Sequence, residues 1–219
     1  MMPIATSELH MRLEREGVVP VLTIDRVESA LPLADALFEG GLAVAEVTFR
    51  AAAAAEVIAK IRSERPAMLV GAGTILTPEH VRQAVDAGAQ FGVAPGTNPR
   101  VIEEAQRMKL PFAPGVMTPS DIEAALAWGV TVLKFFPAGT AGGVQALKSI
   151  TAPYAHLGLR FIPTGGVSPE NLRQYIELNT VIAAGGTWIA TRNDVAEGHW
   201  DLIRERCRAA CSIVREVRK

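Results

Sequence analysis

Short apolar runs alternate with helical patterns of apolar residues along most of the chain. Runs typical of buried strands lie at residues 18–24, 43–49, 68–71, 90–94, 111–113, 131–136, 160–163 and 181–184. Segments with apolar residues at helical spacing follow them at residues 27–39, 51–61, 78–88, 99–108, 119–128, 144–150, 169–178 and 194–217. Four of these segments begin at a proline and several end at glycine, as helices commonly do. The pattern predicts eight strand–helix units.

Repeated strand–helix units predict a parallel sheet, because each crossover returns the chain in the same direction. Eight uninterrupted units favour closure into a (β/α)8 TIM barrel, an α/β fold. The competing fold is an open Rossmann or flavodoxin-like sheet, which is weakened because residues 71–76 (GAGTIL) carry only the first two glycines of a dinucleotide fingerprint. Ahead of the barrel, residues 7–16 predict a short helix with Leu9, Met11 and Leu13 available for packing.

Composition limits the function classes. The 219 residues suit one barrel domain, residues 1–219. The 22 basic and 23 acidic residues nearly cancel, so no overall field attracts nucleic acid or an anionic membrane, and no apolar run is long enough to span one. The two cysteines, Cys207 and Cys211, have no second pair to complete a zinc site, and no leader pattern is seen. We expect a cytoplasmic protein with reduced thiols that binds any anion locally.

The strand at residues 131–137, TVLKFFP, contains a lysine within an apolar run. Strand side chains alternate, so Lys134 shares its face with Val132 and Phe136. Desolvating an ammonium group there is costly, which favours a neutral amine able to attack a carbonyl carbon. The alternative is a lysine at a strand end that buries its stem and extends its charge to solvent.

A glutamate lies on an equivalent face of the second strand. Glu46 shares that face with Val44, Thr48 and Arg50, and by parity it points into the barrel like Lys134. The functional interpretation makes Glu46 a proton carrier and Lys134 the nucleophile. The alternative is a buried ion pair with a structural role only.

Glycine-rich loops follow several of the strands, at the barrel end where active sites form. GAGT presents Thr74 after the third strand, and APGT presents Pro95 after the fourth. The seventh and eighth strands end in residues 164–166 (TGG) and 185–187 (GGT), where paired glycines can turn backbone N–H groups toward an anion. This pattern indicates a phosphorylated small-molecule substrate.

These motifs resemble those of one enzyme family. GLAVAEVTFR (residues 41–50), GAGT, APGT, LKFFPA (residues 133–138), PTGG and GGTW are similar, in order and spacing, to the 2-keto-3-deoxy-6-phosphogluconate (KDPG) and 4-hydroxy-2-oxoglutarate (KHG) aldolase family. The similarity runs from about residue 18 to the C-terminus. EVTFR and LKFFPA are its most specific motifs.

The resemblance implies a class I aldolase without metal or cofactor, which cleaves KDPG, a phosphorylated 2-oxo acid of the Entner–Doudoroff pathway, to pyruvate and D-glyceraldehyde 3-phosphate. It extends to cleavage of KHG to pyruvate and glyoxylate. It implies an imine on Lys134 with Glu46 as the proton shuttle, and a homotrimer. The remaining residues that it implies are Arg50 and Thr74 for the carboxylate, Pro95 and Phe136 for the pocket wall, and Gly165, Gly166, Gly186 and Thr187 for the phosphate.

Two positions depart from the family pattern. Ala51 stands where threonine is often found, and Thr187 stands where serine is common. Both bear on substrate preference more than on reaction type, so another 2-oxo acid remains open as substrate. A phosphosugar isomerase or epimerase on the same barrel, and a non-catalytic binder of phosphorylated metabolites, are the functions of other classes that share the glycine pattern.

Overall fold

A computed structural model describes residues 6–218 of the chain. The strands are β1 (Val18–Leu22), β2 (Val44–Thr48), β3 (Leu69–Gly73), β4 (Phe91–Val93), β5 (Phe112–Ala113), β6 (Gly115–Val116), β7 (Val132–Phe135), β8 (Arg160–Phe161) and β9 (Ala184–Gly186). The α-helices are α1 (Thr6–Glu16), α2 (Ala30–Glu39), α3 (Ala54–Glu64), α4 (Pro78–Asp86), α5 (Pro99–Arg107), α6 (Pro119–Leu126), α7 (Gly143–Thr151), α8 (Pro169–Ile176), α9 (Arg192–Glu197) and α10 (Trp200–Val217). Two 3-10 helices are η1 (Val27–Ser29) and η2 (Ala152–Leu157).

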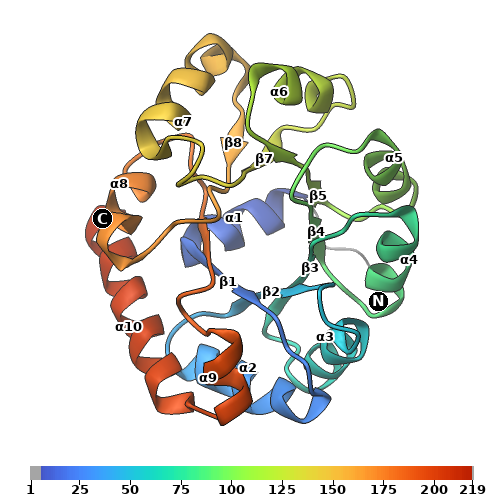
Figure 1. Cartoon of the computed structure of the whole chain (residues 1–219), viewed down its shortest axis with the longest axis vertical. Helices are drawn as coiled ribbons and strands as arrows, with labels where there is room; N and C mark the ends of the chain where they lie inside the picture. Colours follow the sequence, from blue (N-terminus) through green and yellow to red (C-terminus); the bar gives the residue numbers. More distant parts are fainter. Residues whose placement is uncertain (1–5, 219) are drawn as a thin grey trace.

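The strands form curled parallel sheets with helices on their outer side (Figure 1). One sheet has six strands in the order β5-β4-β3-β2-β1-β9, and the other has three in the order β6-β7-β8. All recorded strand pairs are parallel, as the repeated strand–helix pattern predicts. Isolated bridges join Phe161 to Val181 and Thr164 to Gly185, between the second sheet and the region of β9.

Most strand bounds differ from those predicted by one or two residues, and the differences are larger at three places. The predicted strand at residues 111–113 is present as β5, and a further short strand that was not predicted, β6, follows after Pro114, which has no N–H to donate to a ladder. The predicted strand at residues 160–163 pairs regularly only over β8. The predicted strand at residues 181–184 is regular only from Ala184, as β9. These short strands are the edge strands of the two sheets, and each pairs regularly with one neighbour only.

The helices follow the sequence signals closely. Pro78, Pro99, Pro119 and Pro169 are the first residues of α4, α5, α6 and α8, where the missing N–H costs nothing. The predicted C-terminal helical segment is instead two helices, because Gly198 adopts a φ of 73° and ends α9 before α10 begins. In residues 6–218 no helix is long and apolar enough to cross a membrane.

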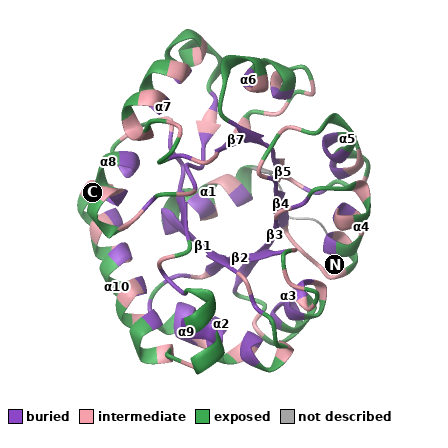
Figure 2. Cartoon of the chain, viewed as in Figure 1, coloured by how far each residue is buried: buried purple, intermediate pink, exposed green. Residues whose placement is uncertain are grey.

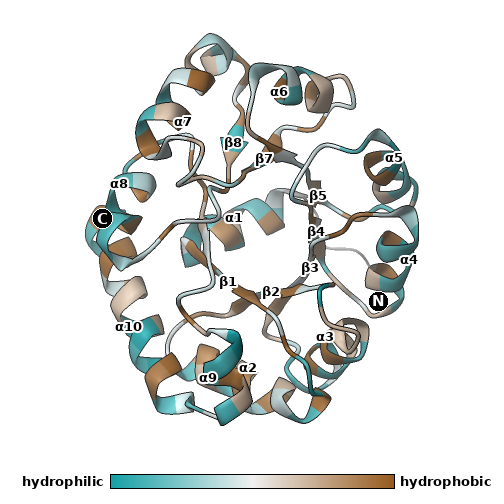
Figure 3. Cartoon of the chain, in the orientation of Figure 1, coloured by the Kyte–Doolittle hydropathy of each residue, from teal (hydrophilic) through white to brown (hydrophobic). Residues whose placement is uncertain are grey.

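Buried residues gather on the strands and on the inner helix faces, with exposed polar faces outside (Figures 2 and 3). Side-chain alternation divides the apolar residues into two clusters. Ala45 and Val47 of β2 pack toward the surrounding helices, whereas Val44 belongs to an inner cluster. The same alternation turns Glu46 and Thr48 toward the inside.

Helix α1 covers one end of the curled sheets, across the middle of the view in Figure 1. Its Leu9 and Leu13 are buried in the inner cluster with strand residues such as Leu69 and Phe91. Met11, which the sequence also offered for packing, is 64% exposed and points away. The predicted N-terminal helix is therefore present, and it supplies the inner core with two of the three expected side chains.

Candidate active site

Lys134 and Glu46 meet on the inner side of the curled sheets although they are 88 residues apart in the chain. Lys134 Nζ donates hydrogen bonds to Glu46 Oε1 at 3.0 Å and to Oε2 at 3.3 Å. Both residues are buried, with 5% and 2% exposure. Desolvation makes their interaction stronger than a surface ion pair, and it also makes either charge costly without its partner. Proton exchange between the two groups therefore needs no solvent molecule as an intermediary.

A glycine opposite Glu46 makes room for its carboxylate. Gly73 ends β3, and a Cβ built there would lie 2.2 Å from Glu46 Oε1, far inside van der Waals contact. The ring of Phe136, two residues after Lys134, lies with its centroid 5.8 Å from Lys134 Nζ. This distance is within the range of a cation–π contact. The pair is thus bounded by bare backbone on one side and an aromatic ring on another.

The carboxyl ends of the strands surround a cavity of about 120 Å3 that contains this pair. All ten site residues expected from the sequence line it: Glu46, Arg50, Thr74, Pro95, Lys134, Phe136, Gly165, Gly166, Gly186 and Thr187. Val21, Thr164 and Val167 line it as well and were not anticipated. Side-chain alternation along β1 could have predicted that Val21 points inward. Thr164 and Val167 could have been predicted because they flank the predicted glycine pair in the sequence.

Arg50 and Thr74 sit on one side of the cavity, just beyond β2 and β3. Arg50 is exposed, and its Nε donates to Thr48 Oγ1 at 3.2 Å. Thr74 adopts a positive φ of 57°, which is unusual for a β-branched residue and holds the chain in a sharp turn at the cavity edge. A guanidinium and a hydroxyl at this edge are suited to a carboxylate.

Glycines form another edge of the cavity, after β8 and at the end of β9. Gly165 and Gly166 have φ values of 86° and 82°, in the left-handed region that favours glycine. Gly139 N–H donates to the carbonyl of Gly165 at 2.7 Å, and a Cβ on Gly166 would lie 2.9 Å from the Gly139 Cα. Because these glycines have no side chains, their backbone is accessible to a ligand next to Thr187. Backbone N–H groups beside a hydroxyl can bind an anion.

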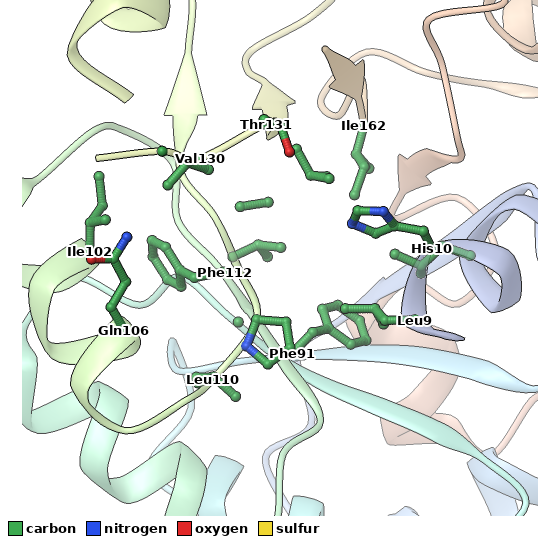
Figure 4. Close-up of a pocket in the computed structure, with 17 residues that line it drawn as sticks. Leu9, His10, Phe91, Ile102, Gln106, Leu110, Phe112, Val130, Thr131 and Ile162 are labelled. Carbon is green, nitrogen blue, oxygen red and sulfur yellow. The ribbon is translucent and has the colours of Figure 1, made fainter. Parts of the chain in front are cut away.

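A second cavity, of about 230 Å3, lies at the opposite ends of the strands (Figure 4). Leu9 and His10 of α1 line it together with Phe91, Phe112 and other mostly apolar residues at the starts of β4, β5 and β7. Neither Lys134 nor Glu46 reaches it. The reactive groups therefore gather in the smaller cavity.

In residues 6–218 there is also no group of three or more His, Cys, Asp or Glu side chains that could hold a metal ion.

The chain is similar to known proteins of one family. The family described as "Aldolase: KDPG and KHG aldolase" matches residues 9–206. The 2-dehydro-3-deoxy-phosphogluconate aldolase of Haemophilus influenzae is 40% identical over 214 residues, 98% of this chain and 100% of that protein. The KHG/KDPG aldolase of Escherichia coli K12 is 39% identical over 193 residues, 88% of this chain and 90% of that protein.

Solved structures show the same similarity. The KDPG aldolase of Legionella pneumophila, with pyruvate captured as a covalent carbinolamine intermediate, has a TM-score of 0.87 and 37% identity, covering 92% of this chain and 97% of that one. The enzyme of Zymomonas mobilis ZM4, solved with 3-phosphoglycerate, has a TM-score of 0.85 and 36% identity, covering 95% and 97%. The resemblance of the motifs is confirmed: the chain belongs to the KDPG and KHG aldolase family.

Proposed function

We propose that this chain is a class I aldolase that cleaves KDPG to pyruvate and D-glyceraldehyde 3-phosphate. The observation that carries the proposal is the buried contact of 3.0 Å between Lys134 Nζ and Glu46 Oε1, in a cavity with a guanidinium at one edge and glycines at another. The pyruvate in the Legionella enzyme and the 3-phosphoglycerate in the Zymomonas enzyme correspond to the two halves of this substrate. No metal or cofactor takes part in the proposed reaction.

Imine formation begins with proton transfer from the Lys134 ammonium to the Glu46 carboxylate. The neutral amine attacks the C2 carbonyl carbon of the substrate, and Glu46 moves protons between nitrogen and oxygen as the carbinolamine forms. Glu46 then protonates the carbinolamine hydroxyl, which leaves as water. The result is a protonated imine on Lys134 and a Glu46 carboxylate again.

Cleavage uses the protonated imine as an electron sink. Glu46 accepts the proton of the C4 hydroxyl, the C3–C4 bond breaks, and its electron pair moves to the imine nitrogen to give an enamine. D-Glyceraldehyde 3-phosphate leaves. The enamine takes the proton back from Glu46 at C3, and hydrolysis of the imine releases pyruvate.

We assign the remaining roles on the support of each residue's position in the cavity. Arg50 and Thr74 bind the carboxylate, and Pro95 and Phe136 form the wall. The phosphate lies against the backbone of Gly165, Gly166 and Gly186 and the hydroxyl of Thr187, supported by the positive φ angles of Gly165 and Gly166, which favour residues without a side chain there.

Trapping with borohydride tests the reaction. Pyruvate with borohydride should add one reduced pyruvyl group to the native protein, located at Lys134 by peptide mass spectrometry. Lys134→Arg should abolish the adduct and the aldolase activity, because a guanidinium forms no imine under these conditions. Lys148→Arg, on α7 outside the cavity, is the matched control and should keep both. An adduct at another lysine, or none, refutes the proposal, and so does aldolase activity retained in Lys134→Arg. Isomerisation of a phosphosugar that survives in Lys134→Arg favours the isomerase.

The same chemistry applies to KHG, for which the E. coli relative is also named. KHG carries no phosphate, and its second carboxylate is bonded directly to C4, closer to the reacting bond than the KDPG phosphate, so we expect it to make no contact with the glycine edge. Thr187→Val removes a hydroxyl and keeps the shape of the side chain. We expect it to lower kcat/KM for KDPG several-fold and leave kcat/KM for KHG unchanged, and equal losses for both substrates would contradict the assigned phosphate position.

Three broader features belong to the same proposal. We propose a single domain with a closed (β/α)8 barrel, supported by the continuous run from β5 through Pro114 to β6 and by the bridges from Phe161 to Val181 and from Thr164 to Gly185. We propose a homotrimer, for which light scattering should give about 70 kDa from chains of 23.3 kDa. The free thiols of Cys207 and Cys211 support a cytoplasmic location.

A further inference from the structure

Arg50 needs a partner to hold its guanidinium over the cavity. It is exposed, and a free arginine side chain samples many rotamers, so a binding role carries an entropy cost unless the side chain is oriented beforehand. Within residues 6–218 its one recorded hydrogen bond runs from Nε to Thr48 Oγ1, at 3.2 Å. Thr48 is only 1% exposed and does not line the cavity.

Counting donors and acceptors determines the direction of each hydrogen bond around Thr48. A threonine hydroxyl has one proton and two lone pairs. The Leu22 carbonyl, 2.8 Å away, can only accept, so it takes the Thr48 proton. Arg50 Nε can only donate, so its N–H takes one of the two lone pairs of Thr48 Oγ1. The Thr23 hydroxyl, 3.0 Å away, must then donate to the other lone pair.

We call these three hydrogen bonds, which join Thr48 to Leu22, Thr23 and Arg50, the relay. They use the one proton and both lone pairs of the Thr48 hydroxyl, so that this hydroxyl has a single orientation. Leu22 is the last residue of β1 and Thr23 follows it, so the relay connects Arg50 to the end of β1 as well as to Thr48 of β2. Since Nε is occupied, both terminal nitrogens of Arg50 remain available to a ligand. These two nitrogens form the fork that matches a carboxylate in bidentate fashion.

We infer that Thr48 is a positioning residue that, with Thr23 as its second donor, orients the Arg50 guanidinium to receive the carboxylate of the 2-oxo acid. This inference rests on the proposed function for the identity of the ligand. It assigns a role to two residues that touch neither the substrate nor Lys134. If the Thr48 hydroxyl only links β1 to β2, its removal should lower the stability of the protein. It should then not change apparent affinity in a way that depends on the ligand's charge.

Two probes separate these roles. Pyruvate carries the carboxylate, whereas methyl pyruvate has the same ketone without the charge. Both can be trapped at Lys134 with borohydride, and the probe concentration that gives half-maximal trapping reports apparent affinity. Only pyruvate requires an oriented Arg50.

Thr48→Val removes the hydroxyl at nearly constant volume. We expect the half-maximal pyruvate concentration to rise about tenfold, as for loss of a hydrogen bond to a charged group, and the value for methyl pyruvate to stay within about twofold. Thr48→Ser should restore the value for pyruvate, and Thr23→Val should give a smaller rise. Thr151→Val is the matched control, because the buried Thr151 hydroxyl also donates to a carbonyl at 2.8 Å, that of Leu147, away from the cavity. It should change neither probe.

Equal weakening of both probes in Thr48→Val, or no change in either, overturns the inference while wild-type trapping at Lys134 still supports the aldolase. Should Thr48→Val not fold, Thr23→Val is read alone, and an unchanged value for pyruvate overturns the inference. If the wild-type chain traps neither probe, the proposed function itself fails, and the role of Arg50 with it.

Discussion

Replacing Gly73 by alanine should separate Lys134 from Glu46 although neither of these two residues is mutated. The added Cβ would lie 2.2 Å from Glu46 Oε1, 2.7 Å from its Cγ and 2.8 Å from its Cδ. Ordinary contact needs more than 3 Å, so the carboxylate must move by about 1 Å. The hydrogen bond to Lys134 Nζ, now 3.0 Å, would then be lost or severely bent.

The cost to catalysis follows from the proposed role of Glu46. A misplacement of about 1 Å can cost roughly 100-fold, and general acid–base catalysis contributes about 100-fold to 10,000-fold. We expect kcat for KDPG cleavage to fall by about 100-fold or more. Borohydride trapping of pyruvate should slow as well, because imine formation uses the same proton shuttle. Gly73 has no positive φ, so the backbone itself tolerates alanine.

The assay couples pyruvate release to lactate dehydrogenase and compares two variants. Gly96→Ala is the matched control, because a Cβ at Gly96 meets nothing within 4 Å and its backbone also lies outside the positive-φ region. It should keep nearly full activity. If Gly73→Ala keeps kcat within about threefold of the wild type while remaining folded by circular dichroism, the reasoning that Glu46 must stay in place is wrong.

Three further predictions concern stability and reactivity. Leu13→Ala should lower the unfolding free energy by about 2–5 kcal/mol in urea denaturation, because Leu13 is 2% exposed in the inner cluster; an effect below about 1 kcal/mol would contradict the role of α1. Burial would raise the pKa of Asp194, but hydrogen bonds from Thr191 and Arg206 overcome it and lower the pKa from 3.8 to about 2. A lowered folded-state pKa gives stability that is present above about pH 4 and is lost as pH falls toward 2. Asp194→Asn should therefore lower Tm at pH 7 and make Tm decline less in acid. A dependence of Tm on pH equal to that of the wild type would refute this role of Asp194. Burial raises the pKa of Cys207 to about 12, so a thiol reagent at pH 8 should modify Cys207 only after unfolding, and rapid modification of the native chain would show otherwise.

Local patterns in the chain were sufficient for the element order and for the faces of the strands. Alternation places Glu46 and Lys134 on inward faces because side-chain direction along a strand depends only on position parity. Prolines such as Pro78 and Pro119 mark helix starts because their missing N–H is harmless there. The family motifs extended these local signals to ten residues, all of which lie around one cavity.

The fine geometry depended on how the elements pack. The distance of 3.0 Å between Lys134 and Glu46 joins strands 88 residues apart, and it depends on sheet curvature and register, which local periodicity does not encode. The room that Gly73 leaves for a carboxylate and the placement of Thr23 beside Thr48 arise in the same way, from neighbouring strands. By itself the sequence determined the strand–helix order, the inward faces and the family motifs, because these are properties of consecutive residues. Only the tertiary structure decided which groups touch and which hydroxyl orients Arg50, because contacts between distant segments exist only after the strands are brought together.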